Sequence, residues 1–274
     1  ERVWALPRPR SEWARGARPC EYIEGAVSPI RAVFFDAGFT LVRAEPSVGE
    51  IYAEAASRYG AMDPSPREIA DTLSETWGDY ARKYRDAEVA ARTNDAAEKE
   101  KWTYFTGEVV RRVKGFDAAG FDREGWFREI HDRFGTPEVW RVFPGVFDAL
   151  RALRARGIRL GVISNWDSRL QGVLDGLALT PFFDAILISS RIGYLKPRPE
   201  IFRAALSALR IRPREALHIG DSREDDVIGA RAVGMRALQV LHGGPYGEDG
   251  PPDIIYHFRD LPRIVRSASR NLFG

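Results

Sequence analysis

Short, continuous apolar runs recur along much of the chain and are separated by segments of helical periodicity. The first run is AVFF at 32–35, and later runs lie at 158–164, 183–189, 215–220 and 235–241. Between the later runs, apolar residues recur at the i, i+3, i+4 spacing of an amphipathic helix. Strands that are apolar throughout are typical of a parallel sheet covered by helices on both faces. The pattern therefore predicts an α/β fold with a doubly wound, Rossmann-like parallel sheet.

Residues 46–140, called the helical insertion below, follow a different pattern. Four segments there show helical periodicity, start near Ser or Asp residues that can cap a helix, and contain no buried-strand run. They predict helices inserted between the first strand and the second. Their aromatic residues could line a substrate pocket, although aromatic stripes at helical spacing are more often core.

The first thirty residues fit neither pattern. They contain several prolines and show no period of 2 or 3.6 residues, so we expect residues 1–30 to form an extension outside the fold. The predicted organisation is an α/β core formed by residues 31–45 and 141–274, interrupted by the helical insertion at 46–140. A chain of 274 residues is long enough for one large core and a second, smaller unit.

Net charge and cysteine content indicate which binding partners and which cellular compartment to expect. With 41 basic and 39 acidic residues, the net charge of +2 supplies no overall field that would attract nucleic acid or a membrane surface. Cys20 is the only cysteine, which excludes an intrachain disulfide and a thiolate metal cluster. The chain lacks the run of roughly 20 apolar residues that a membrane helix needs, and lacks a secretory signal pattern. We therefore expect a cytoplasmic protein without nucleic-acid or membrane partners.

Polar residues gather where the predicted strands end. Because ligands bind beyond the carboxyl ends of the strands in such a sheet, these residues are expected to converge on one edge. Any one of them alone is more often a turn or cap residue, but together they indicate a site. In chain order they are Asp36, Ser164, Asn165, Lys196, Asp221, Asp225 and Asp226.

The amino-acid composition favours a functional role for Lys196 but not for the histidines. Only five of the 41 basic residues are Lys, and Lys196 is the only one after the helical insertion. A compact ammonium group suits a point where clustered oxygens must be neutralised, and a planar guanidinium does not replace it there. Lys196 therefore favours a site over a solvated surface. The four histidines have no metal-ligand spacing, and His218, within a predicted strand, is expected to be a satisfied core residue.

The order of these motifs resembles the haloacid dehalogenase superfamily. The resemblance extends from residue 31 to about residue 262 and places the helical insertion as a type 1 cap, as in subfamily I hydrolases. The forms SNWDSRL and IGYLKPRPEIF further resemble one subgroup of these hydrolases. The motifs that carry the resemblance are DxxxTL from Asp36 to Leu41, an apolar strand ending in Ser164-Asn165, Lys196-Pro197, and GDSxxxDDVxGAxxxGM from Gly220 to Met235.

The resemblance implies a Mg²⁺-dependent phosphatase for a small phosphorylated molecule. Asp36 would attack the phosphoryl group and form an aspartyl-phosphate, while Mg²⁺ would bridge that carboxylate and the phosphoryl oxygens. Asp221, with Asp225 or Asp226, would hold the metal. A hard cation suits such a cluster, because carboxylates without one would repel each other and the phosphate. The residues implied for binding the phosphate and ordering its loop are Thr40, Ser164, Asn165 and Lys196.

Gly38 departs from the family pattern. Most family phosphatases have a second Asp at this position, which protonates the leaving oxygen and then activates water. General acid and base help of this kind is worth roughly 10²- to 10⁴-fold. In the family, the residue at this position also gives the metal its backbone carbonyl, which Gly38 still supplies. We therefore expect the nucleophile, the metal site and the phosphate clamp to be kept and the proton carrier to be missing.

Three functions remain open at this point. The first is a phosphatase that is slow on alkyl phosphates, or that takes its proton from the cap, from the substrate or from Asp167, which is more often a helix cap. The second is a noncatalytic protein that binds a phosphorylated ligand or a partner chain in the inherited pocket. The third is a carbon-halogen hydrolase, since a halide leaves without a proton. The acidic cluster around Asp221 argues against it, because those carboxylates would repel a haloacid.

Overall fold

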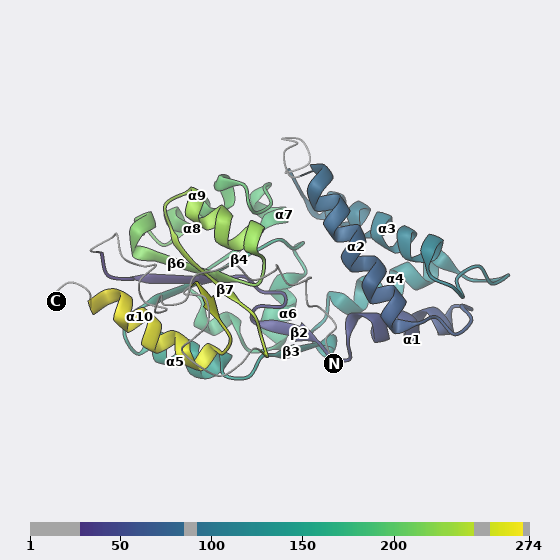
Figure 1. Ribbon diagram of the computed structural model, residues 1–274, viewed down its shortest axis with the longest axis horizontal. Coiled ribbons are helices and arrows are strands. Elements are labelled where there is room, and N and C mark those ends of the chain that lie inside the picture. The colour runs from purple at the N-terminus through teal and green to yellow at the C-terminus, as the bar shows by residue number, and fades with distance from the viewer. Residues whose placement is uncertain (1–27, 85–91, 244–252, 271–274) are drawn as a thin grey trace, which may run out of the picture.

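The computed structural model describes residues 28–84, 92–243 and 253–270 of the 274-residue chain. Figure 1 shows a central sheet with helices on both faces and a group of further helices beside it. The predicted N-terminal extension lies almost entirely outside the described residues, as does Cys20. No helix in the described part of the chain is long and apolar enough to cross a membrane.

The sheet has six strands in the order β5-β4-β1-β6-β7-β8, and every adjacent pair is parallel. This confirms the predicted doubly wound α/β fold. Strand order changes direction around β1, which places the end of β1 at the position where such folds bind ligands. The strands are β1 Ala32–Phe35, β4 Arg159–Ser164, β5 Ala185–Ile188, β6 Ala216–Gly220, β7 Arg236–Val240 and β8 Ile254–Ile255.

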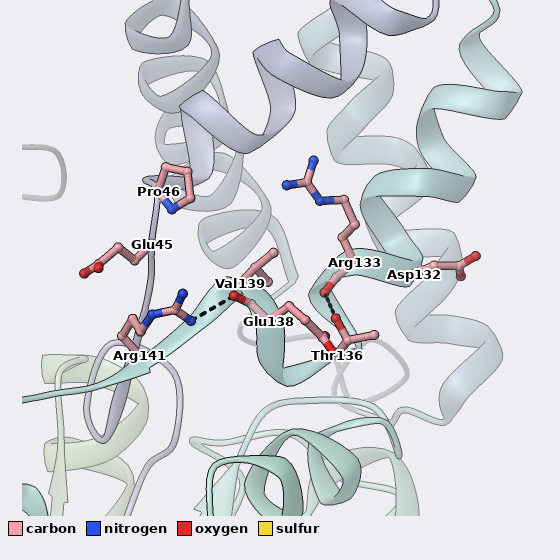
Figure 2. A pocket seen from close by; sticks show the side chains of 8 residues that line it. All are labelled: Glu45, Pro46, Asp132, Arg133, Thr136, Glu138, Val139 and Arg141. Carbon is pink, nitrogen blue, oxygen red and sulfur yellow. Dashed lines mark hydrogen bonds between the residues drawn. The ribbon is translucent and has the colours of Figure 1, made fainter.

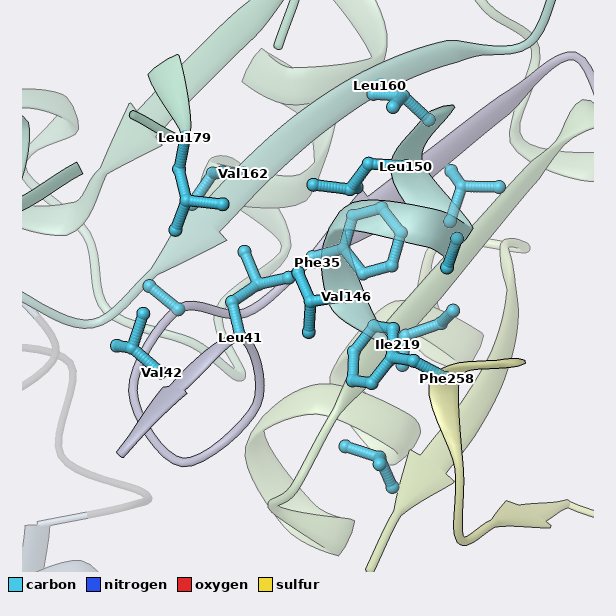
Figure 3. Packing of buried hydrophobic residues seen from close by; sticks show 14 of the residues in the cluster. Phe35, Leu41, Val42, Val146, Leu150, Leu160, Val162, Leu179, Ile219 and Phe258 are labelled. Atoms are coloured by element: carbon cyan, nitrogen blue, oxygen red, sulfur yellow. The ribbon is translucent and has the colours of Figure 1, made fainter. Parts of the chain in front are cut away.

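Helices cover both faces of the sheet, which explains why its central strands are apolar throughout. All four residues of β1 are buried. On one face, Phe35 stacks on Phe258 with ring centroids 5.9 Å apart, and Leu150 of α5 packs nearby (Figure 3). On the other face, Phe34 joins a cluster that includes Phe202 of α8. The helices of the core are α5 Val146–Arg154, α6 Leu170–Gly176, α7 Ser189–Ile192, α8 Pro199–Ala208, α9 Gly229–Ala232 and α10 Leu261–Arg270.

The four helices beside the sheet lie in the four segments whose periodicity predicted them. They share a hydrophobic cluster of their own, in which Trp126 and Phe105 are almost completely buried. Ser47 and Glu50 form a reciprocal capping box at the start of α1, and Asn94 caps α3. The helices are α1 Val48–Arg58, α2 Pro66–Tyr84, α3 Asp95–Arg112 and α4 Arg123–Phe134.

A two-stranded antiparallel ribbon, absent from the sequence prediction, joins the helical insertion to the sheet. It pairs β2, Val42–Ala44, with β3, Trp140–Val142. Each strand has only three residues, which is too short for a periodic pattern to reveal. The ribbon holds the beginning and the end of the helical insertion together, so both connections leave the core at one place (Figure 1).

Candidate active site

Asp36 follows β1 directly and lies near the middle of the sheet. Its backbone N–H donates to the carbonyl of Ile219 on the neighbouring β6, at 2.8 Å, which extends the sheet pairing by one residue. The residue is 7% exposed. The loop then turns tightly through Phe39, whose φ of +55° lies in the left-handed region. A non-glycine residue there costs roughly 1 to 3 kcal/mol, so the surrounding structure holds this loop in a strained conformation.

Two donors from distant parts of the chain contact the same oxygen of Asp36. Ser164 Oγ, at the end of β4, donates to Asp36 Oδ1 at 3.0 Å, and Lys196 Nζ donates to it at 2.7 Å. The backbone of Lys196 is fixed by Asn165, whose amide accepts from its N–H at 2.7 Å and donates to its carbonyl at 3.0 Å. The structure thus brings four predicted residues together, with Asn165 holding the Lys196 backbone in place.

Asp226 connects Lys196 to the end of β6. Its Oδ1 accepts from Lys196 Nζ at 2.6 Å and lies 2.9 Å from His218 Nε2, while its Oδ2 accepts from the Ser222 N–H at 3.0 Å. The carboxylate packs against Gly220, where an added Cβ would lie 2.0 Å from Asp226 Cγ. A glycine is therefore required at this position for the carboxylate to approach the strand end.

Asp221 and Thr40 complete the cluster from opposite sides. Thr40 Oγ1, which is fully buried, donates to Asp221 Oδ1 at 3.3 Å. Gln239 Nε2, on β7, donates to the Asp221 backbone carbonyl at 2.8 Å. Thr40 therefore reaches the cluster through Asp221 and links the loop after β1 to the loop after β6.

Burial and unequal pairing give the three carboxyl groups different acidities. Burial raises the pKa of Asp36, and the charge of Lys196 offsets this only in part. Burial, together with the charges of Asp36 and Asp226, raises the pKa of Asp221 well above its usual value. Burial also opposes ionisation of Asp226, but the Lys196 charge and the His218 contact outweigh it and hold the pKa of Asp226 low. Asp221 is thus the carboxylate whose charge is least well balanced.

The donor set fits a hard divalent cation. Asp36, Asp221 and Asp226 each place one carboxylate oxygen within 4.8 Å of the others. Lys196 is paired with two of these three carboxylates, so an added cation would relieve the remaining repulsion. Among the described residues, the group of possible ligands contains Asp226 and does not contain its neighbour Asp225. The metal role that the sequence left open between these two residues therefore favours Asp226.

Comparison with known proteins places this arrangement in a family. Residues 30–234 match the model of the haloacid dehalogenase-like hydrolases. The chain belongs to the haloacid dehalogenase-like hydrolase family. Human haloacid dehalogenase-like hydrolase domain-containing protein 3 is 33% identical over 224 residues, covering 80% of this chain and 84% of that protein. The subgroup predicted from the SNWDSRL and IGYLKPRPEIF motifs is the one to which this human relative belongs, so the comparison confirms the predicted resemblance.

Proteins named as phosphatases are among the relatives of this haloacid dehalogenase-like hydrolase. A phosphoserine phosphatase from Thermus thermophilus is 35% identical over 153 residues, covering 50% of this chain and 61% of that protein. The crystal structure of a HAD phosphatase from Thermococcus onnurineus aligns with a TM-score of 0.58 and 25% identity. It covers 86% of this chain and 98% of that structure.

Gly38 lies beside Trp166 in this hydrolase. The backbone of Gly38 is outside the left-handed region, so its conformation does not require glycine. Asp167, considered above as a substitute acid, is held instead by Arg169, whose guanidinium donates to Oδ1 at 2.9 Å and to Oδ2 at 2.6 Å. Both oxygens of Asp167 are therefore engaged in an ion pair at the start of α6.

His218 is a residue whose contact the sequence prediction missed. It is fully buried, its Nε2 contacts Asp226, and its Nδ1 has no hydrogen-bond partner among the described residues. The expectation of a satisfied core histidine therefore holds for its burial and for Nε2, and is wrong for Nδ1. A signal was present in the sequence, because a polar residue within an otherwise apolar buried strand, two positions before a strand-end Gly, needs a partner.

An open groove of the described surface lies away from the Asp36 cluster. It has a volume of about 510 Å³ and lies where the ribbon meets the helical insertion (Figure 2). None of its lining residues belongs to the cluster around Asp36, so we assign it no part in the chemistry. They are Glu45, Pro46, Asp132, Arg133, Thr136, Glu138, Val139 and Arg141.

Proposed function

We propose that this protein is a Mg²⁺-dependent phosphatase that transfers the phosphoryl group of a small molecule to Asp36 and then to water. One observation carries the proposal. Asp36, at the end of the central strand, is contacted on one oxygen by Ser164 and Lys196 and lies beside the underbalanced Asp221. This is the combination that phosphoryl transfer needs: a nucleophile, hydrogen-bond donors for the phosphoryl oxygens, and a metal site.

The contacts suggest how Asp36 would act. Both donors contact Oδ1, whereas Oδ2 receives no hydrogen bond from the described residues. One oxygen is thus held while the other remains available to attack phosphorus, which forms the new P–O bond as the bond to the leaving oxygen breaks. Water then attacks the phosphorus of the aspartyl-phosphate, releasing phosphate and restoring the carboxylate.

The remaining residues would bind the phosphoryl group or the metal ion. Lys196 and Ser164 are placed to donate to the phosphoryl oxygens, whose negative charge spreads in the transition state. Asp36, Asp221 and Asp226, with the Gly38 carbonyl, are the residues that would hold Mg²⁺. When bound, Mg²⁺ would supply Lewis-acid stabilisation of the phosphoryl oxygens. Asn165 and Thr40 would act by fixing Lys196 and Asp221.

The helical insertion would serve as the cap over this site. Its α3 begins against the core: Asp95 accepts from the Ser168 N–H at 2.9 Å and from Ser168 Oγ at 2.6 Å. The Thr93 N–H, just before α3, donates to the Gly193 carbonyl at 3.1 Å. These contacts hold the helical insertion on loops that follow β4 and α7, next to the strand ends. A cap in this position would exclude water from the reacting groups.

The deciding experiment is a panel of phosphorylated metabolites and aryl phosphates, assayed with Mg²⁺ and with EDTA, in the parent and in Asp36→Asn. We expect Mg²⁺-dependent phosphate release that Asp36→Asn eliminates while the variant keeps the parent melting temperature. Turnover that survives Asp36→Asn would contradict the proposed nucleophile. Binding of phosphate analogues without any turnover would support the noncatalytic alternative. Metal-independent halide release from 2-haloacids would support the carbon-halogen hydrolase.

A further inference from the structure

The space beside Gly38 is bounded by one side chain. An ideal Cβ built on Gly38 would lie 3.3 Å from Trp166 Cζ3 and 3.9 Å from Trp166 Cε3. Apart from the two chain neighbours of Gly38, the described residues place no other heavy atom within 4 Å of it. A contact of 3.3 Å is tighter than ordinary van der Waals separation, and a carboxylate would extend further from the same Cβ. The indole of Trp166 therefore crowds a side chain at residue 38 from its first carbon onward.

Trp166 is fixed in that position. Its backbone N–H donates to Ser189 Oγ at 3.1 Å, and its carbonyl accepts from that hydroxyl at 3.0 Å and from the Ser190 N–H at 3.2 Å. Its ring packs on Trp140 of β3 with centroids 5.0 Å apart, and Trp140 also packs on Phe39 at 6.3 Å. An aromatic wall thus runs from the ribbon to the nucleophile loop.

The edge that Trp166 presents to Gly38 is purely apolar. Cζ3 and Cε3 belong to the six-membered ring of the indole, whereas the only polar atom, Nε1, is in the other ring. The structure therefore replaces a proton carrier at position 38 with a hydrocarbon surface. Because the Gly38 backbone is not left-handed, glycine is explained here by the room it leaves for the indole.

We infer that Gly38 and Trp166 form a matched pair that selects aryl phosphates, whose aromatic leaving group packs against the indole. The inference rests on the proposed function, since the leaving group must face the position of the missing acid. An aryloxide departs unaided because phenols have a pKa near 10, as for tyrosine. An alkoxide is far more basic, its parent acid being closer to water at about 15.7, and needs a proton donor.

The reaction balances without an enzymatic acid. Asp36 forms a bond to phosphorus, the bond from phosphorus to the aryl oxygen breaks, and the aryloxide leaves with the electron pair and takes a proton from solvent. Water then attacks phosphorus and gives its proton to solvent, while the bond from phosphorus to Asp36 breaks and restores the carboxylate, so the products are a phenol and inorganic phosphate. Aromatic stacking on Trp166 would add recognition that an alkyl or sugar phosphate lacks.

The binding arm of the test needs no turnover. Calorimetry would compare benzylphosphonate with ethylphosphonate, in which a methylene group replaces the bridging oxygen of an aryl or alkyl phosphate. We expect the parent to bind benzylphosphonate about 10-fold more tightly, Trp166→Ala to reduce that preference to less than 2-fold, and Trp166→Phe to keep most of it. A full preference in Trp166→Ala would overturn the inference.

The turnover arm uses Gly38→Asp alone and combined with Trp166→Ala, assayed on glycerol phosphate. We expect the single variant to gain less than 2-fold over the parent, because Trp166 blocks the new carboxylate, and the double variant to gain about 10-fold or more. An equal gain in both variants, or no gain in a double variant that keeps the parent melting temperature, would overturn the matched pair. The binding and turnover measurements also separate this inference from the proposed phosphatase activity. A preference for benzylphosphonate without any hydrolysis would contradict the phosphatase activity. Hydrolysis that depends on Asp36 but shows no preference for aryl substrates would contradict the inference about Gly38 and Trp166.

Discussion

Lys196 in the α/β core and Lys101 in the helical insertion are both almost completely buried, at 4% and 6% exposure. Each is paired with carboxylates at short distance, yet the origin of the partners differs. Lys101 Nζ lies 2.5 Å from Glu98 Oε2, three residues earlier on the same helix. The two carboxylates of Lys196 come from Asp36 and Asp226, which are 160 and 30 residues away in the chain.

The charge balance also differs between the Lys101 site and the Lys196 site. Glu98 is also satisfied by Thr93 Oγ1 at 2.8 Å, and Lys101 lies 5.3 Å from the centre of the Trp77 ring, so this site is electrically complete. Lys196 is paired with two carboxylates, and a third, Asp221, lies within 4.8 Å of them, so negative charge is left over. A buried, rare residue is therefore not a sign of function by itself. Partners that converge from distant segments, with charge left unbalanced, indicate a site that binds something.

The largest effect is expected from Lys196. Lys196→Ala and Lys196→Arg should both lower kcat/KM on an aryl phosphate by about 10²- to 10³-fold and abolish binding of a metal fluoride complex. The guanidinium is too large and too planar for the point between two carboxylates. The matched control is Lys101→Arg, which should change kcat/KM less than about 3-fold. A Lys196→Arg variant that binds the complex as the parent does would contradict this view of the lysine.

Glu98→Gln tests the opposite side of the comparison. It leaves the Lys101 ammonium buried without a carboxylate, which should lower the free energy of unfolding by about 3 kcal/mol in urea titrations. Glu98→Gln with Lys101→Met removes the unpaired charge and should recover most of that loss. Both variants should keep the phosphate-analogue affinity of the parent. If Glu98→Gln weakens that affinity 10-fold or more while folded, the helical insertion pair also belongs to the binding site.

Asp225 and Asp226 provide a matched pair of neighbouring acids. Asp226→Asn removes a charge that Lys196 and His218 share, and should lower kcat/KM by about 100-fold. Asp225→Asn should lower it less than about 3-fold, because Asp225 is not among the convergent carboxylates. Equal losses in the two variants, measured on the same substrate at saturating Mg²⁺, would contradict the choice of Asp226.

His242 shows what happens to a half-buried ionisable group without an opposite charge beside it. Its Nε2 lies 2.9 Å from the Thr40 carbonyl and its ring stacks on Phe143, and burial lowers its pKa to about 4. The unfolded chain, with a histidine pKa near 6.5, binds more protons between these values, so stability falls as pH drops from 6.5 to 4. The partly exposed ring reduces the expected loss to about 2 kcal/mol.

The measurement for His242 is the free energy of unfolding against pH in the parent and in His242→Gln, whose amide can still donate to the Thr40 carbonyl. The difference between the two proteins should change by about 2 kcal/mol from pH 6.5 to pH 4, in favour of the variant at low pH. Parallel curves over this range would show that His242 does not titrate as its surroundings indicate.

The smallest effect is expected at His218, which acts through Asp226. His218→Phe removes the donor to Asp226, which in turn holds the ammonium group of Lys196. The variant should therefore lower kcat about 10-fold and weaken metal fluoride binding. His218→Gln places an amide N–H close to the position of Nε2 and should restore kcat to within about 3-fold. Stability loss in His218→Phe with unchanged kcat would show that the residue serves packing alone.

The sequence by itself determined the architecture and the set of candidate residues. Runs buried on both faces must be apolar throughout, so the sheet strands β1, β4, β5, β6 and β7 were recognisable, as were the helices from their 3.6-residue period. Parallel strands place their carboxyl ends at one edge, so Asp36, Ser164, Lys196 and Asp221 could be expected to meet there. The family followed from the same order of motifs.

The tertiary structure decided which groups touch. Asp225 and Asp226 are adjacent in sequence, and only the path of the chain after Gly220 turns Asp226 toward Lys196. The partners of His218 and the indole beside Gly38 come from segments 8 and more than 100 residues away, and no local pattern encodes such contacts. Local periodicity specifies which face of an element is buried, whereas the chemistry of this site depends on angstrom-scale distances that arise only when several elements pack together.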